Sequence, residues 1–125
     1  LGTAVTFDAI GANATHLGGV IAPGLASMTD NLAKRTALLP KIELTEPAHA
    51  IGKSTTEAMM VGAIFGYRGL IKEIIQKISA EMKEKPIIVA TGGDAELIAR
   101  GLPEIDHVCP TLTLEGIRIA ASLQF

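Results

Sequence analysis

The chain has 125 residues, a net charge of −2, three Phe, one Tyr, no Trp and a single cysteine, Cys109. This length fits one domain, and the lack of clustered Lys and Arg, together with so few aromatic side chains, argues against a nucleic-acid partner. One cysteine cannot form an internal disulfide, no charged segment precedes an apolar N-terminal run, and the longest strongly apolar stretch, 58–67, is too short to cross a bilayer. These features predict a cytoplasmic protein without a membrane partner.

The N-terminal part of the chain predicts a β-hairpin. Residues 1–10 are rich in β-branched and apolar side chains, residues 11–13 carry a turn signal, and a second extended run covers residues 14–22. Gly2 and Thr3 open the first strand with a residue that lacks Cβ and with an exposed hydroxyl. A ligand could approach the backbone there, although a threonine also suits a strand that binds nothing.

Helical patterns follow the hairpin. Apolar residues at helical spacing predict a helix over residues 25–39, which Pro40 ends. After a connector over residues 41–50, Ser54 and Glu57 match a capping box, which predicts the start of a long helix.

The long helix has two parts. Residues 58–65 are apolar on every side, as in a helix that is buried all round, whereas the part after Gly69 is amphipathic. Gly62 and Gly66 lie four positions apart and permit the close approach of a neighbouring element. We expect a kink or a short break between Gly66 and Gly69.

The C-terminal part alternates strands and helices. The pattern predicts a buried strand over residues 87–90, a turn at 91–93, a helix over 94–100, a strand over 106–108 and a final helix over 114–123. Together with the N-terminal hairpin, this order indicates the α/β class, with helices that cover a mixed sheet.

The Thr91-Gly92-Gly93 turn is a candidate ligand site. Ligands of open α/β sheets bind beyond the carboxyl ends of strands, and two glycines let a flat or phosphorylated group approach the backbone. A tight strand-to-helix turn without a ligand uses glycine for the same steric reason, so the spacing alone leaves both interpretations open.

Other motifs give weaker signals. The Gly-Lys-Ser run at 52–54 starts a helix as a P-loop does, but Pro47 stands where that motif needs a glycine, and a connector replaces the preceding strand. Thr55 belongs to the polar run that caps the long helix, and this capping role alone would explain a threonine at this position. The three histidines lack metal-ligand spacing, and no nucleophile–base arrangement is visible.

Six motifs nevertheless stand in one order along the chain. They are Leu-Gly-Thr-Ala-Val-Thr-Phe-Asp at 1–8, Gly-Gly-Val-Ile-Ala-Pro-Gly at 18–24, Arg-Thr-Ala-Leu-Leu-Pro at 35–40, Gly-Lys-Ser-Thr-Thr-Glu at 52–57, Ala-Thr-Gly-Gly at 90–93 and Pro-Thr-Leu-Thr-Leu at 110–114. In register, they closely resemble the C-terminal half of the type III pantothenate kinases, members of the acetate kinase, sugar kinase and actin-like ATPase superfamily. The resemblance implies a ribonuclease-H-like (actin-like ATPase) domain, in which the N-terminal hairpin belongs to the mixed sheet.

The resemblance also implies ligands. ATP would be held at its phosphates by Gly2 and Thr3 and beside its adenosine by Gly92 and Gly93. Thr55 would contact pantothenate in the partner subunit's site, across a homodimer interface. Mg²⁺ and a monovalent cation, K⁺ or NH₄⁺, are the implied cofactors, and the implied reaction forms 4′-phosphopantothenate, the first committed step toward coenzyme A.

The same resemblance places the catalytic carboxylates outside this chain. The general-base aspartate is expected upstream and the cation-binding aspartate directly before Leu1, so no catalytic or metal-binding residue is assigned within residues 1–125. We therefore expect the chain to be the C-terminal domain of a two-domain kinase, inactive without its N-terminal domain.

Two alternatives stay open. The family also has members described as accessory factors for transcription, so the chain could belong to a non-catalytic regulator with a kinase-like fold. The other alternative is a structural role, in which an actin-like subdomain mediates dimerisation through the apolar helix at 58–67.

Overall fold

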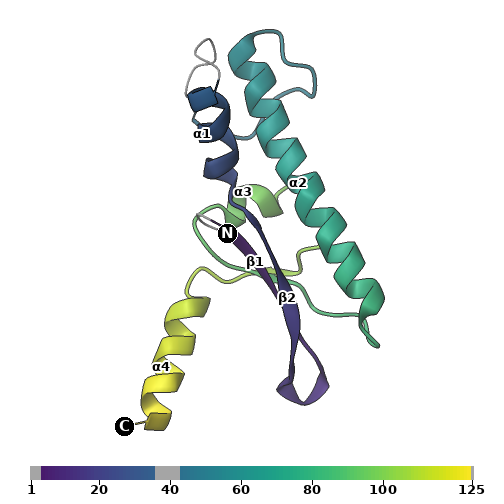
Figure 1. Ribbon diagram of the computed structural model, residues 1–125, viewed down its shortest axis with the longest axis vertical. Coiled ribbons are helices and arrows are strands. Elements are labelled where there is room, and N and C mark those ends of the chain that lie inside the picture. Colours follow the sequence, from purple (N-terminus) through teal and green to yellow (C-terminus); the bar gives the residue numbers. More distant parts are fainter. Residues whose placement is uncertain (1–3, 36–42, 125) are drawn as a thin grey trace.

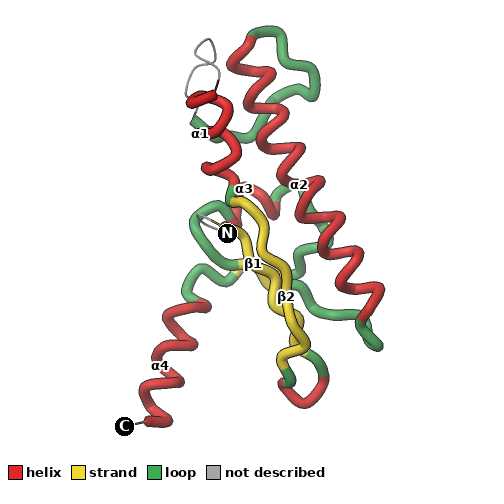
Figure 2. Tube along the Cα trace, viewed as in Figure 1, coloured by secondary structure: helices red, strands yellow, loops and turns green. Residues whose placement is uncertain are grey.

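The structure, a computed structural model, describes residues 4–35 and 43–124. The described chain combines strands and helices (Figure 1), and Figure 2 shows the same trace coloured by secondary structure. In chain order the elements are β1 (Ala4–Ile10), the 3-10 turn η1 (Ala12–Ala14), β2 (His16–Pro23), α1 (Leu25–Arg35), α2 (Thr55–Glu81), β3 (Val89–Ala90), α3 (Ala95–Ala99), β4 (His107–Val108) and α4 (Leu112–Gln124).

The predicted N-terminal hairpin is confirmed. Strands β1 and β2 pair in antiparallel register from Ala4 opposite Pro23, and a bulge shifts the register next to Ile10. Gly18, at that bulge, has φ +127°, a conformation that favours glycine. A Cβ on Gly19 would lie 2.2 Å from the carbonyl oxygen of Phe7, so the two strands approach each other closely at this position.

The predicted capping box is also confirmed. The Ser54 hydroxyl accepts a hydrogen bond from the Glu57 amide at 3.1 Å, and the Glu57 carboxylate accepts one from the Lys53 amide at 2.8 Å. These contacts satisfy backbone donors that the first turn of α2 leaves without helical partners.

Helix α2 continues through Gly66 and Gly69, so the predicted kink is wrong. The residues between these glycines explain why: Tyr67 and Arg68 are both buried, and their contacts fix the middle of the helix against the rest of the chain. Tertiary packing therefore outweighs the low helix propensity of two glycines.

The core joins the start of α1, the middle of α2 and α3. Leu25, Ile64, Tyr67 and Ile98 are its largest fully buried side chains. The amphipathic second part of α2 is confirmed, because Ile71 and Ile75 face this core. The first part is not buried on every side in the described chain, since Phe65 is 38% exposed.

The strands form two separate two-stranded sheets within the described residues, where one mixed sheet was expected. Strands β3 and β4 pair in parallel through only two residues each. Ile87 is 73% exposed and Val89 is 44% exposed, so the strand expected to be buried is covered incompletely. The physical reason is that the described residues leave the side chains of Ile87 and Val89 in contact with water.

The connector at 43–54 contains no strand, and the expected end of α1 at Pro40 lies outside the described residues. Helix α4 extends away from the rest of the chain (Figure 1), and residues 111–123 are all exposed. Within the described ranges, no helix is long and apolar enough to span a membrane.

Candidate functional site

The Thr91-Gly92-Gly93 turn presents open backbone between β3 and α3. Gly92 has φ +109°, and its carbonyl accepts a hydrogen bond from the Ala95 amide at 3.2 Å. A Cβ on Gly93 would meet nothing within 4 Å, and both glycines are exposed. The sequence needs glycine at Gly92 for conformation, whereas the space beside Gly93 is available to a ligand.

The buried hydroxyl of Tyr67 lies near this turn, close enough for the charge of Asp94 to act on it. Burial raises the pKa of Tyr67, the negative charge of Asp94 raises it further, and the backbone of Leu25 partly offsets both effects. No hydrogen bond of normal geometry reaches the hydroxyl from the described residues. Leu25, the first residue of α1, and Asp94, the residue after the glycine turn, are therefore both close enough to act on the Tyr67 hydroxyl.

Gly2 and Thr3 lie outside the described residues. Ala4, which follows them, pairs with Pro23, two positions before Leu25. The first described residue of β1 thus lies at the end of the hairpin where α1 begins. The next residue, Val5, belongs to the same core cluster as Tyr67.

Arg68 forms the most extensive set of polar contacts in the described chain. Its Nε donates to the carbonyl of Ile98 at 3.1 Å, and its Nη2 donates to the carbonyl of Leu97 at 2.6 Å. Nη1 and Nη2 donate to the two carboxylate oxygens of Glu46 at 3.1 Å and 2.5 Å. Its guanidinium also lies 5.9 Å from the ring centroid of Phe65. We call this set of contacts the Arg68 clamp.

The clamp favours the ionised form of the Glu46 carboxylate. The hydrogen bond from Arg68 lowers the pKa of Glu46, and the charges of Arg68 and Arg100 act in the same direction, although burial opposes them. The two side chains of the pair differ in solvent exposure: that of Arg68 is 7% exposed, whereas that of Glu46 is 41% exposed. A charge-assisted, bidentate pair of this kind is strong and geometrically specific.

Sequence reasoning missed the Arg68 clamp, but a signal was present. Arg68 occupies the same helical face as Ile64, Ile71 and Ile75, at the spacing that marks buried positions. A lone arginine on an apolar stripe is rarely buried without a partner. Its partner, Glu46, lies 22 positions away in an irregular connector and cannot be identified from periodicity.

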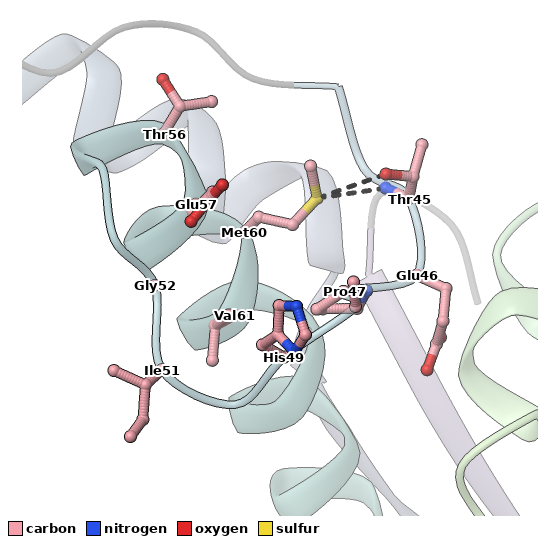
Figure 3. A pocket seen from close by; sticks show the side chains of 11 residues that line it. Thr45, Glu46, Pro47, His49, Ile51, Gly52, Thr56, Glu57, Met60 and Val61 are labelled. Atoms are coloured by element: carbon pink, nitrogen blue, oxygen red, sulfur yellow. Dashed lines mark hydrogen bonds between the residues drawn. The ribbon is translucent and has the colours of Figure 1, made fainter.

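Thr55 is the first residue of α2 and is exposed. Beside it, the connector and the first turns of α2 enclose a hollow of about 190 Å³, which we call the α2 hollow (Figure 3). Figure 3 shows the Met60 sulfur facing Thr45, whose amide donates to it at 3.2 Å. The lining residues are Thr45, Glu46, Pro47, Ala48, His49, Ile51, Gly52, Thr56, Glu57, Met60 and Val61.

The chain does not bring Thr55 and the glycine turn together. Tyr67, which lies near the turn through its interaction with Asp94, follows Thr55 by twelve positions on one continuous helix. At 1.5 Å per residue, the two levels are about 18 Å apart along the axis of α2. A ligand that touched both regions of one chain would have to span that distance.

The other polar groups of the described residues include one exposed ion pair and one cysteine. Asp8 and His16 pair at 3.1 Å across the exposed hairpin. Cys109 is half-buried. In residues 4–35 and 43–124, no group of three or more His, Cys, Asp or Glu side chains could hold a metal ion.

Comparison with known proteins identifies the family. The sequence model of the type III pantothenate kinase family matches residues 1–77, which is more than half of the chain. The chain belongs to this family.

Curated relatives carry the same name. A type III pantothenate kinase from Akkermansia muciniphila is 62% identical over 122 residues, which are 98% of this chain and 50% of that protein. Those from Moorella thermoacetica and Dehalococcoides mccartyi strain CBDB1 are 50% and 48% identical, over 94% of this chain and 46% and 45% of each relative. The chain therefore spans about half the length of these relatives.

A solved structure has a similar fold. A protein from Campylobacter jejuni, described as a conserved member of the Baf family of transcriptional activators, matches with a TM-score of 0.66 and 25% identity. The match covers 99% of this chain and 56% of that one. The arrangement of the described elements thus occurs within a longer protein.

Proposed function

We propose that the chain is the C-terminal domain of an ATP-dependent pantothenate kinase, with the ribonuclease-H-like (actin-like ATPase) fold, that forms 4′-phosphopantothenate for coenzyme A synthesis. Membership of the type III pantothenate kinase family is the observation that carries this proposal. The open turn at Gly92 and Gly93, directly after a strand and before a helix, supports it because this is where α/β proteins admit a nucleotide.

In this proposal the chain supplies binding surfaces and the other half supplies the catalytic carboxylates. Gly92 and Gly93 lie beside the adenosine, and Gly2 and Thr3 hold the phosphates. Phosphoryl transfer depends mainly on positioning and charge stabilisation. In the proposal, the carboxylates that bind Mg²⁺ and K⁺ or NH₄⁺ belong to the half of the polypeptide that precedes this chain.

The two glycines of the turn provide a matched test of ATP binding in the full-length protein. Gly93→Ala should raise the KM for ATP about tenfold without loss of stability, because the new methyl group enters space that the chain leaves open. Gly92→Ala should instead lower the unfolding free energy by about 1–3 kcal/mol, since alanine is strained at that φ. An unchanged KM for ATP in Gly93→Ala would contradict the proposal that the nucleotide binds at this turn.

We propose that Thr55 contacts pantothenate in the partner subunit's site of a homodimer. Its exposure, and its distance of about 18 Å along α2 from the level of the glycine turn, support a role in a different subunit's site. Gly62 and Gly66 also support an interface on α2, since a Cβ on either would meet nothing within 4 Å. A second α2 could then approach closely along that face.

A methyl group on Gly66 distinguishes an interface from a solvent-exposed face. On an exposed helix, Gly66→Ala should stabilise the protein by about 1 kcal/mol, because alanine is the better helix former. At a close helix contact it should instead raise the dimer dissociation constant at least about tenfold. We expect the second result in sedimentation equilibrium, with Gln76→Ala, which is exposed and about 15 Å further along α2 than Gly66, as the control that leaves the dimer unchanged.

The N-terminal half of the same protein is the second proposed partner. Helix α4 exposes a row of large apolar side chains, and Ile87 and Val89 are exposed beside β4. Water-exposed apolar faces of this extent mark contact surfaces. We propose that the other half of the polypeptide, about as long as this chain in the relatives, covers α4.

A second candidate function is a non-catalytic regulator of the same family. The name of the Campylobacter jejuni protein of similar fold favours it, because that protein is described as a transcriptional activator. Turnover separates the two candidates, since a regulator would release no ADP with pantothenate present.

A further inference from the structure

We infer that Arg68 is a positioning residue that couples the two ligand-binding regions of the proposed kinase, the glycine turn and the connector that leads to Thr55. The inference rests on the proposed function for its kinetic consequences. Its structural basis is the Arg68 clamp, in which one buried guanidinium holds both regions at once.

On the side of the turn, the clamp holds α3. This helix has only five residues and no side-chain cap at Asp94, so its own hydrogen bonds fix it weakly. Arg68 binds the carbonyls of Leu97 and Ile98 in the last turn of α3, where a cation is favoured. Because Gly92 and Gly93 lead directly into α3, the clamp sets the position of the turn against α2.

Gly101 shows how closely the chain is fitted around this guanidinium. A Cβ at this position would lie 2.7 Å from both Cζ and Nε of Arg68. The backbone after α3 therefore passes directly against the charged group, and only glycine leaves room for it.

On the other side, the clamp holds the connector. Residues 43–54 have no regular secondary structure, and Glu46 is their charged attachment to α2. Glu46 also lines the α2 hollow, next to Thr45, which contacts Met60. Releasing Glu46 frees one wall of the hollow, whereas removing the Arg68 contacts releases the connector and α3 together.

Kinetics of the full-length protein test this coupling. Arg68→Lys, which keeps the charge but loses the bidentate geometry, should raise the KM for ATP and for pantothenate by about three- to tenfold each, with a smaller change in kcat. Glu46→Gln should raise the KM for pantothenate alone. The double variant should be no worse than Arg68→Lys, because both changes break one network.

Glu43→Gln is the matched control, since Glu43 is exposed in the same connector, and it should leave both constants unchanged. A merely structural role for Arg68 would lower the amount of active protein and hence kcat, with both KM values unchanged. That result would overturn the inference, as would strictly additive effects of the two substitutions.

Hydrogen exchange gives a readout that does not require activity. Arg68→Lys should speed amide exchange both in residues 95–101 and in residues 43–54, whereas Glu46→Gln should speed it in the connector alone. Faster exchange in only one of the two segments of Arg68→Lys would contradict the coupling. Failure of the proposed function would show separately, as no turnover by the unaltered protein, and the exchange result would then decide the coupling.

Discussion

Gly52→Ala is expected to lower the unfolding free energy of the full-length protein by about 2–3 kcal/mol. The added Cβ would lie 2.4 Å from the backbone nitrogen of Ala58 and 2.6 Å from its Cα. Both atoms belong to the first turns of α2 and cannot rotate away as a side chain can, so the connector must shift. Urea unfolding measures the loss directly.

The same substitution should also impair pantothenate use. Gly52 lines the α2 hollow and lies three positions before Thr55, so a displaced connector changes the surroundings of the proposed contact. Gly69→Ala is the control, because its methyl group meets nothing within 4 Å and should stabilise α2 slightly. Unfolding of Gly52→Ala at the same urea concentration as the unaltered protein would contradict the close contact.

Ile117→Asp is expected to lower the stability of the full-length protein by about 3 kcal/mol or more. Ile117 is 61% exposed on α4 in this chain, so the charge would cost little if that helix stayed in water. If the N-terminal half covers the helix as proposed, the change removes about 1.5–3 kcal/mol of apolar burial and adds a desolvated carboxylate.

Ser122→Asp provides the control for this prediction. Ser122 lies on the polar stripe of α4 that also carries Glu115 and Arg118, and the same added charge should change stability by less than about 0.5 kcal/mol there. Equal, small effects of both substitutions in thermal unfolding would show that α4 remains in water. That result would contradict the proposal that the N-terminal half covers this helix.

Local sequence signals predicted the local structure well. The hairpin followed from β-branched residues around a turn, and the start of α2 followed from Ser54 and Glu57, whose hydrogen bonds span only three or four positions. The glycine turn at 91–93 and the short helix after it were likewise identified from neighbouring residues.

Features that depend on distant contacts were not predicted. The kink predicted between Gly66 and Gly69 is absent because Tyr67 and Arg68 are buried against other elements, and their contacts keep α2 continuous. The Arg68 clamp joins α2 to a glutamate 22 positions earlier and to carbonyls 29 and 30 positions later. Hydrophobic periodicity carries no information about such pairs, because it reports only which face of one helix is buried.

The family resemblance contributed what local patterns could not. It assigned ligands to Thr3, Gly92 and Thr55, residues whose spacing alone suits an ordinary strand, turn and helix cap. The described structure adds a reason to separate these residues into two groups. Thr55 starts α2, whereas Tyr67, the α2 residue near the turn, lies about 18 Å further along the helix axis.

Pantothenate-dependent ADP release by the full-length protein is the most direct test of the proposed kinase. It should be measured with Mg²⁺, with and without K⁺ or NH₄⁺, beside the isolated 125-residue chain. We predict turnover that requires the monovalent cation and the full-length protein, and no turnover by the isolated chain. Absence of turnover with every cation would contradict the kinase and favour the non-catalytic regulator.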